Sequence, residues 1–450
     1  MKDKIVMPLW AIGIFFTVMN STMFNVSLPN IIKDLDIASN VGAWIISGYS
    51  MVFSLSIVIF SRLSDWIPIR KLLMCGIFLI FASCIVGFFS NQFAFVLLAR
   101  MLQAAGAGPL QALGLILTSR YGPGERRGNA IALIASGAAL AFGIGPVLGG
   151  FITDWAGWHA LFLVSGVVIL LAPLYIKMLP DEKSYPFHTD SRFDVTGTVM
   201  TIIFVSSLLL AVSQLSFIFL LIAAISCFIA FRHFRKITDP FIFPYLFKNL
   251  NYCKLLVIAF CSLALNMGVV FLIPQVLSNL FHTTASFNGL MIFPGAVFTA
   301  ILSPLVGSWI DRSDNFRISV IGHIVMLLAV ITITMTFHFS PYMLLASYVL
   351  FSISYNAIAS SLQNEVTNVL PKSQISSGIG LFQLTQFFGG SVATTILGLM
   401  ISMQHNKPIT YAFTINFAFL IAISAISLGI LIWYNASNKK RFSNDVSQST

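Results

Sequence analysis

The sequence predicts an all-α membrane protein with fourteen spanning helices, arranged as two six-helix bundles and a two-helix central insert. Three observations predict this fold: the apolar composition, the number of long apolar runs, and the distribution of Lys and Arg among the loops. Hydrophobic residues make up 57 % of the 450-residue chain and charged residues only 9 %, and the mean hydropathy is +0.90. A soluble protein of this length carries much more charge, so the composition excludes a soluble fold.

Fourteen segments are apolar enough to cross a bilayer as helices, which takes about 20 residues each. They are residues 7–28, 43–60, 72–89, 93–117, 130–153, 160–179, 195–213, 215–231, 255–276, 289–310, 318–338, 341–361, 377–400 and 411–434. The first has no small-residue cleavage pattern, so we expect it to remain as a helix rather than to be removed as a signal peptide. The seventh and eighth are divided only by Gln214 and nearby serines. One long helix there, and thirteen in all, is the alternative.

The positive charges favour fourteen helices over thirteen. With fourteen helices and a cytoplasmic N-terminus, all but three of the 25 Lys and Arg residues fall in cytoplasmic segments. Lys33 and Lys407 lie outside, and Arg100 lies within a helix. Cytoplasmic loops of membrane proteins carry this excess of positive charge, and thirteen helices would reverse every loop after residue 213. The net charge of +10 therefore reports the topology of the chain. The basic residues are scattered over short loops, which does not indicate nucleic-acid binding.

The longest loop regions, at about 180–194 and 232–254, flank the seventh and eighth helices and mark them as an insert. The expected organisation is an N-terminal bundle over 1–180, central loops with the insert over 181–254, a C-terminal bundle over 255–434, and a polar, irregular cytoplasmic tail over 435–450.

The two halves share a short pattern at the cytoplasmic end of a helix. Residues 61–65 read SRLSD and residues 307–311 read GSWID, each with a small residue four positions before an Asp and cations following. Two matching halves suit a transporter that rocks about a central site.

The fifth apolar run contains the sequence GAALAFGIGPVLGG over residues 137–150. Gly and interior Pro disfavour a helix in water by about 1 and about 3 kcal/mol relative to Ala. In a membrane the backbone must bond to itself, and small residues let neighbouring helices approach closely. We therefore expect a thin, bent helix that serves as a hinge, with Gly145, Pro146, Gly149 and Gly150 at its centre.

These patterns together resemble the major facilitator superfamily, in its fourteen-helix drug:proton antiporter branch. Residues 61–71 are similar to that family's loop between helices two and three, and residues 100–103 (RMLQ) to its fourth-helix motif. Residues 145–150 (GPVLGG) match the fifth-helix motif associated with antiporters, and residues 20–29 (NSTMFNVSLP) resemble the first-helix signature. The resemblance covers the whole chain in helix count and loop pattern. It implies the major facilitator fold, with N- and C-termini in the cytoplasm.

The first-helix form, with Asn20 and the residues NVSLP, is most similar to the tetracycline efflux pumps of Gram-positive bacteria, including chromosomal staphylococcal members. The chain departs from the family pattern where Ser61 and Pro68 replace glycines, and where Ala141 stands in place of another. Multidrug relatives often carry Asp at the position of Asn20. Its absence here disfavours multivalent organic cations as substrates.

Arg100 is the one charged residue deep inside the fourteen predicted segments, since Lys177 lies only two residues from the cytoplasmic end of the sixth. A buried guanidinium costs at least about 2.5 kcal/mol on insertion scales, so it needs polar partners or a water-filled cavity. Asn20 is expected at a similar depth, and Gln103 lies on the same helix face as Arg100. Two interpretations stay open: a static hydrogen-bond anchor, and a sensor whose partners change during transport.

Asp154 ends the fifth helix on the outer side, one helix away from Arg100. Proton exchange needs at least one titratable group, and no Asp or Glu lies within a predicted helix core. We therefore predict proton coupling through Asp154 and Arg100, with a solvated loop carboxylate as the alternative for Asp154. At the cytoplasmic ends, Asp65 with Arg70, and Asp311 in the second half, are predicted to form an inner gate.

Polar side chains on otherwise apolar helices are candidates for the substrate path, with ordinary interhelical hydrogen bonds as the alternative for each. They are Asn20, Gln103, Gln111, Asn266, Gln275, Asn356, Gln383 and Gln386.

The predicted function is proton-coupled efflux of drugs by alternating access, in the cell membrane of a bacterium. The resemblance implies tetracycline, carried as a metal chelate, together with other amphipathic compounds. An uncoupled facilitator, or an exporter of a physiological amphipath such as a fatty acid, is the alternative. We expect a monomer with no cofactor, no metal site, no nucleic-acid partner and no enzymatic activity. The chain has no GxxxxGK[ST] loop for ATP, and its five cysteines lack metal-site spacing.

Overall fold

The structure is a computed structural model that describes residues 3–121, 127–179, 193–312, 315–371, 374–404 and 406–448. Within these ranges the secondary structure is helical, without a β-strand. The predicted all-α class is therefore confirmed.

The N-terminal bundle occupies the first part of the chain and ends in a helix that is broken into three pieces. Its elements are α1 (Asp3–Asp34), α2 (Ser39–Gly42), α3 (Trp44–Leu63), α4 (Ile69–Phe88), α5 (Phe93–Tyr121), α6 (Arg127–Ala156), α7 (Ala160–Gly166), η2 (Val167–Leu171) and α8 (Ala172–Met178). The sequence predicts one continuous helix over 160–179, and the structure corrects this. Pro173 stands at the start of α8, where its missing N–H removes a helical bond to the preceding turn. The tighter 3₁₀ segment η2 accommodates that loss.

The insert is a helical hairpin, as predicted. Helix α9 (Val195–Gln214) and helix α10 (Phe217–Phe234) are joined at Leu215, whose backbone is left-handed with φ of 49°. Because a left-handed residue ends an α-helix, the single long helix that was the alternative is excluded. A short 3₁₀ turn, η4 (Pro244–Lys248), then leads to the second bundle.

The C-terminal bundle contains six helices, and its last one is longer than predicted. They are α11 (Leu250–Leu280), α12 (Ala285–Arg312), α13 (Asn315–Thr336), α14 (Pro341–Val369), α15 (Ile375–Met403) and α16 (Ile409–Gln448). Because α16 runs to Gln448, the predicted irregular tail after residue 434 is wrong. No Gly or Pro follows Gly429, so nothing in the local sequence interrupts the helix.

Thirteen helical spans among the described residues are long and apolar enough to cross a membrane, with α7 to α8 counted as one. The remaining predicted segment corresponds to α6, whose apolar described part is Leu140–Ala156. Each predicted run therefore has a helix in its place. The chain is a multi-pass membrane protein.

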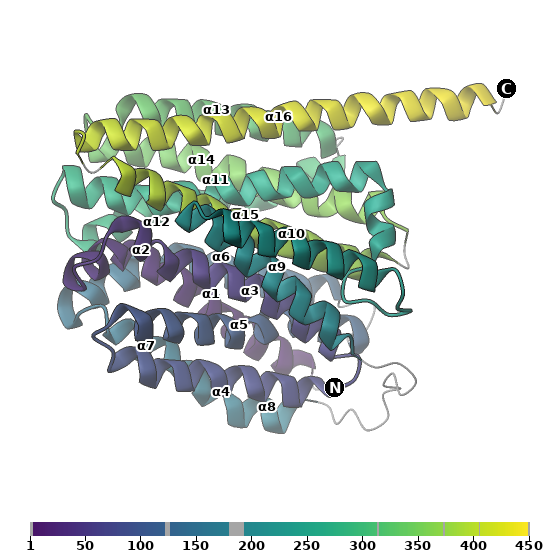
Figure 1. Cartoon of the computed structure of the whole chain (residues 1–450), viewed down its shortest axis with the longest axis horizontal. Helices are drawn as coiled ribbons and strands as arrows, with labels where there is room; N and C mark the ends of the chain where they lie inside the picture. Colours follow the sequence, from purple (N-terminus) through teal and green to yellow (C-terminus); the bar gives the residue numbers. More distant parts are fainter. Residues whose placement is uncertain are drawn as a thin grey trace.

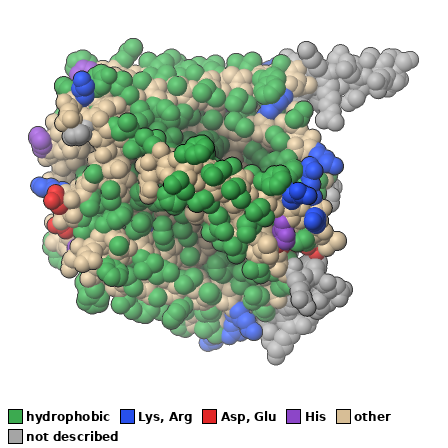
Figure 2. Space-filling model, viewed as in Figure 1, with side chains coloured by type: hydrophobic (Ala, Val, Ile, Leu, Met, Phe, Trp, Pro, Cys, Tyr) green, Lys and Arg blue, Asp and Glu red, His purple; other side chains and the backbone are tan. Residues whose placement is uncertain are grey.

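The two bundles lie side by side, with α9 and α10 across their junction (Figure 1). The insert packs on α3 from one bundle and on α15 from the other. In Figure 2 most of the visible Lys and Arg side chains gather at the right-hand end, toward which both termini lie in Figure 1. We call this the inner end, and the opposite end the outer end, because the sequence places the basic loops in the cytoplasm.

Candidate functional site

Arg100 lies at the centre of a buried polar network in the N-terminal bundle. Its Nη1 donates a hydrogen bond of 3.0 Å to Asn20 Oδ1 from α1, and one of 2.9 Å to Gln103 Oε1 one turn along α5. Gln103 Nε2 in turn lies 3.6 Å from Cys84 Sγ on α4. Arg100, Asn20 and Gln103 are 1 %, 2 % and 0 % exposed. The structure thus brings Arg100 together with Asn20, which was expected at a similar depth, and with Gln103, which was expected on the same helix face.

Two aromatic rings complete the surroundings of the guanidinium. Its Cζ lies 4.0 Å from the ring centroid of Phe24 on α1 and 4.0 Å from that of Tyr49 on α3. Cation–π attraction of this kind is worth about 2 kcal/mol or more when the cation is desolvated. It partly offsets the cost of burying the charge.

Among the described residues no carboxylate forms an ion pair with Arg100. The Nε atom of Arg100 and the hydroxyl of Tyr49 are also buried without a hydrogen-bond partner there. Most buried polar groups are hydrogen-bonded, and leaving one unpaired costs about 1–3 kcal/mol. The site therefore holds a positive charge, and the Nε–H of Arg100 and the hydroxyl of Tyr49 have no acceptor among the described residues.

A row of rings connects this network to the C-terminal bundle. Tyr49 stacks on Phe53 at a centroid distance of 5.9 Å, and Phe53 meets Phe387 of α15 edge-on at 4.9 Å. A change in the position of the guanidinium can therefore be transmitted by direct contact to the other half of the molecule.

The glycines of α6 are the positions where this helix touches its neighbours most closely. A Cβ added at Gly145 would overlap Thr22, and one at Gly149 would lie 2.7 Å from Met23 Cα, both on α1. A Cβ at Gly150 would overlap the carbonyl oxygen of Ala285 on α12. Because glycine has no Cβ, it lets helices approach this closely, as small residues do in membrane proteins generally.

Pro146 takes part in the contact with α12, because its carbonyl faces Gly289 so closely that a Cβ there would overlap it. Helix α6 therefore joins the two bundles near the outer end, with Pro146 and Gly150 facing α12. Of the four predicted hinge residues, Pro146 and Gly150 lie at this junction, whereas Gly145 and Gly149 contact α1. Helix α6 is continuous through all four.

Asp154 strengthens the same junction. Its Oδ1 accepts a hydrogen bond of 3.2 Å from the Ala285 amide, and its Oδ2 accepts one of 2.8 Å from the Ser286 amide. These are the first amides of α12, so Asp154 caps that helix from the other bundle in the way that an N-cap residue caps its own. The residue is exposed, and the ion pairs of the described residues do not join it to Arg100.

At the inner end, Asp65 lies 4.0 Å from Arg62 in a long ion pair, and Arg70 is half-buried at the start of α4. Asp311 belongs to α12, but its side chain lies outside the described residues. The inner gate is therefore only partly visible, and its role is a proposal.

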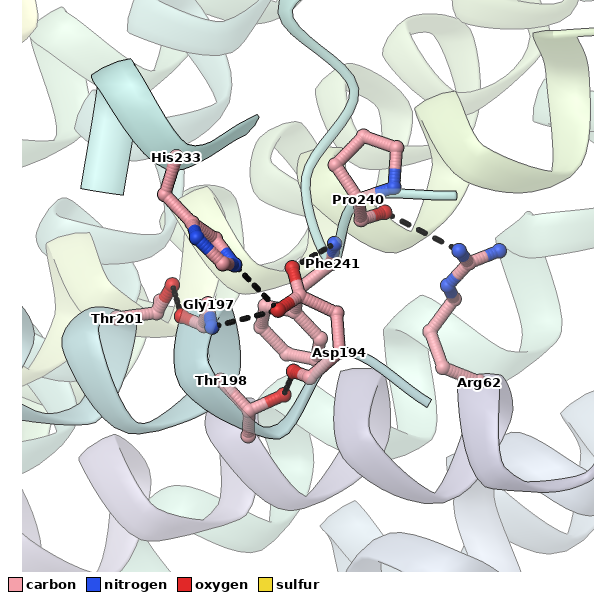
Figure 3. A network of polar contacts seen from close by, with 8 residues as sticks. All are labelled: Arg62, Asp194, Gly197, Thr198, Thr201, His233, Pro240 and Phe241. Atoms are coloured by element: carbon pink, nitrogen blue, oxygen red, sulfur yellow. Dashed lines mark hydrogen bonds and ion pairs between the residues drawn. The ribbon is translucent and has the colours of Figure 1, made fainter. Parts of the chain in front are cut away.

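A second polar network, unforeseen from the sequence, fastens the insert at the inner end (Figure 3). Asp194 caps α9 through a 2.7 Å bond from the Gly197 amide, and it also accepts from the Phe241 amide at 3.0 Å. His233 Nε2 at the end of α10 lies 2.7 Å from the same carboxylate. Arg62 of α3 donates to the carbonyl of Pro240 at 3.1 Å. The insert is thereby tied to the helix that precedes the Asp65 loop.

The remaining substrate-path candidates lie on helices of both bundles. Gln111 on α5, Asn266 on α11 and Asn356 on α14 are half-buried, as are Gln383 and Gln386 on α15. Gln275 is buried, and it accepts a hydrogen bond from Asn279 through its backbone carbonyl.

Gln111 Oε1 and Gln275 Nε2 are buried without a partner among the described residues. The candidates are distributed over α5, α11, α14 and α15, and the structure does not gather them into one network as it does Asn20 and Gln103.

Phe24 and Tyr49 are the site residues that the sequence did not single out. The signal for Phe24 was its position one helical turn after Asn20 on the same face. No comparable signal marks Tyr49, because its contact with Arg100 depends on how α3 packs against α5.

Comparison with known proteins places this architecture in a wide group of transporters. The family model described as Major Facilitator Superfamily matches residues 10–394, and again residues 255–447. Among curated proteins, the chain is 25 % identical over 457 residues to the riboflavin transporter RibZ of Clostridioides difficile, covering 96 % of this chain and 97 % of that protein. It is 27 % identical over 406 residues to the multidrug export protein EmrB of Haemophilus influenzae, covering 87 % and 79 %.

Solved structures agree in fold. A bacterial homolog of the human lysosomal transporter Spinster superposes with a TM-score of 0.68 at 14 % identity, covering 96 % of each chain. The peptide transporter POT in complex with sulfate gives a TM-score of 0.69 at 16 % identity, covering 95 % of this chain and 94 % of that one.

Proposed function

The chain belongs to the major facilitator superfamily, and on that premise we propose that it exports amphipathic small molecules from the cytoplasm in exchange for protons. It is a membrane transporter of small molecules rather than an enzyme. The direction of transport, the coupling to protons and the choice of tetracycline as first substrate are the proposal.

The observation that carries the proposal is the bond between Asp154 and the first amides of α12. A carboxylate at a helix N-terminus is stabilised by the partial positive charge of the helix dipole, by about 0.3–1 kcal/mol. A proton from the outside removes that charge and one acceptor, and so weakens the contact that holds the outer ends together. External protons then favour opening to the outside, which is the step that releases an exported substrate.

Arg100 supplies the second part of the proposed coupling. It places a fixed positive charge inside the N-terminal bundle, in contact with rings that reach Phe387 of the other half. In this scheme the hydrogen bonds of Arg100 to Asn20 and Gln103 change as the halves move.

The chemistry of the Arg100 network favours substrates with little net positive charge. No carboxylate pairs with Arg100 among the described residues, so nothing there attracts a multivalent cation. Tetracycline as a metal chelate fits this limit, with the divalent ion belonging to the substrate and not to the protein. The likeness to a multidrug export protein supports export.

A second candidate is a carrier that needs no protons, for fatty acids or for a flat ring system such as riboflavin. The charge of Arg100 favours an anionic amphipath, since among the described residues it has an unpaired donor and no ion-paired carboxylate. The likeness to a protein named as a riboflavin transporter supports the ring system.

Everted membrane vesicles separate the two candidates, because their cytoplasmic face is outside. We expect tetracycline to accumulate in vesicles that carry the protein when respiration acidifies the lumen, and a protonophore to abolish the accumulation. Riboflavin and a fatty acid are tested in parallel. Uptake of any of these that survives the protonophore would contradict proton exchange and favour the facilitator.

A further inference from the structure

A cavity at the inner end of the C-terminal bundle lies apart from Arg100, Asp154 and the insert. Its volume is about 780 Å³, and it is formed where α11 begins, where α16 leaves the bundle, and just before α15. The described lining residues include Lys248, Asn249, Lys254, Gln374 and Trp433.

Lys254 is the unusual member of this set. It is only 8 % exposed, and its described contacts are a 2.6 Å hydrogen bond from Nζ to Ser437 Oγ and the ring of Trp433 at 4.2 Å. Burying an ammonium group is costly unless it is paired. No Asp or Glu is among the described lining residues, so the cavity presents a positive charge without an acidic partner.

The other polar groups of the cavity also suit an anionic ligand. Lys248, which ends η4, is exposed and lines the same cavity. Gln374 and Asn249 also line it, and Asn249 is engaged in capping α11 and in donating to the carbonyl of Val369. Two cations with the amide residue Gln374 beside them form a site for a phosphate group.

The wall of the cavity that faces the lipid is apolar. Val257 on α11 is exposed, and Trp433 on α16 is 60 % exposed, in a chain that spans the membrane. Trp is favoured where the acyl chains meet the headgroups. The sequence after Ser437 on α16 adds Lys439, Lys440 and Arg441. Basic pockets between helices on the cytoplasmic side are suited to anionic lipid headgroups.

We propose that this cavity binds an anionic phospholipid of the inner leaflet, with Lys254 and Lys248 on its phosphate and the acyl chains along Val257 and Trp433. The lipid bridges the start of α11 and the end of α16. This inference does not depend on the transported substrate or on protons.

Purified full-length protein in neutral detergent tests the proposal by native mass spectrometry and thermal unfolding. The probes are phosphatidylglycerol, phosphatidylcholine and inorganic phosphate. The variants are Lys254→Gln and Lys248→Gln, and the matched control is Lys236→Gln, an exposed cation at the same end of the molecule.

We expect wild type and Lys236→Gln to retain phosphatidylglycerol and to be stabilised by it, and phosphatidylcholine to have little effect. Each lining variant should bind phosphatidylglycerol about fivefold more weakly, the factor that corresponds to about 1 kcal/mol per lysine near an anionic surface. The lipid-induced shift is compared within each variant, so a lower starting stability of Lys254→Gln does not obscure it. If that variant does not fold, Lys248→Gln alone decides.

Three results would overturn the proposal. Equal binding of phosphatidylglycerol by wild type and both lining variants would exclude the lysines. Equal stabilisation by phosphatidylcholine would show a purely apolar groove, and full stabilisation by inorganic phosphate alone would show a site for the free anion.

Discussion

The carboxylate of Asp154 accepts a 2.8 Å hydrogen bond from the amide of Ser286, and so joins the end of α6 to the beginning of α12. This contact connects the two bundles through one charged group at the outer end. Asn at this position would remove the charge and keep one of the two acceptors for α12, whereas Ala would remove both acceptors.

Asp154→Asn should resemble the protonated carboxyl and lose the response to external protons. The amide oxygen keeps one of the two hydrogen bonds from α12, whereas the charge that a proton would remove is no longer present. We expect drug accumulation driven by a pH gradient to fall at least about tenfold. The measurement is uptake into everted vesicles at several lumenal pH values.

Asp154→Ala is the matched control, because it removes the cap as well as the charge. Losing a cap costs about 1 kcal/mol, so this variant should populate the outward-open state more than Asp154→Asn. Spin labels at Trp155 and His282, in a background without the exposed Cys75 and Cys227, report the separation of the outer ends. Identical distance distributions in both variants would show that the hydrogen bonds do not hold the contact.

Gly150→Ala should disturb the same junction by size alone. The added methyl group would overlap the carbonyl oxygen of Ala285, and overpacking of this kind costs about 1–3 kcal/mol. We expect a shift toward the outward-open state in the same distance measurement. Gly166→Ala is the control, since its Cβ would lie an ordinary 3.5 Å from Cys84. A similar shift in that variant would show that the effect does not come from overlap with α12.

Arg100→Lys should fold and reach the membrane but transport poorly. Lysine keeps the charge, yet it lacks the planar group that lies between Phe24 and Tyr49 and bonds both Asn20 and Gln103. We expect transport to fall about tenfold or more with unfolding temperature changed by only a few degrees. Unchanged transport with a large loss of stability would instead identify Arg100 as a static anchor.

Much of this architecture could be predicted from the sequence, because the signals are local. Apolar runs gave the spanning helices, and Leu215 lies where the serines near Gln214 marked a turn. The sequence placed Asn20 at a depth similar to that of Arg100 and Gln103 on the same helix face, and the structure joins the three by hydrogen bonds. Spacing along a helix determines depth and face, so contacts of this kind are readable before the structure is known.

Contacts between distant segments were not readable in that way. Asp194 and His233 are 39 positions apart and meet only because α9 and α10 fold back on each other. The bond of Asp154 to α12 spans 132 positions. Such contacts depend on how the helices pack, which no local pattern in the sequence records.

Asp194→Ala should loosen the insert without affecting the Arg100 network. The substitution leaves the amides of Gly197 and Phe241 and the ring of His233 without their acceptor, at a cost of about 1–3 kcal/mol. We expect a lower unfolding temperature and faster proteolysis in the loop at 235–243. Asp239→Ala, in that same loop, is the control and should resemble wild type; equal behaviour of the two variants would show that the network of Figure 3 does not fasten the insert.

The most direct test of proton exchange is the movement of protons when substrate is added. Everted vesicles that contain the protein are acidified inside by respiration and followed with a pH-sensitive dye. The account predicts that tetracycline, added with a divalent cation, makes protons leave the lumen in vesicles with wild-type protein, and that Asp154→Asn abolishes the response. Accumulation of tetracycline with no accompanying proton efflux would contradict the central claim.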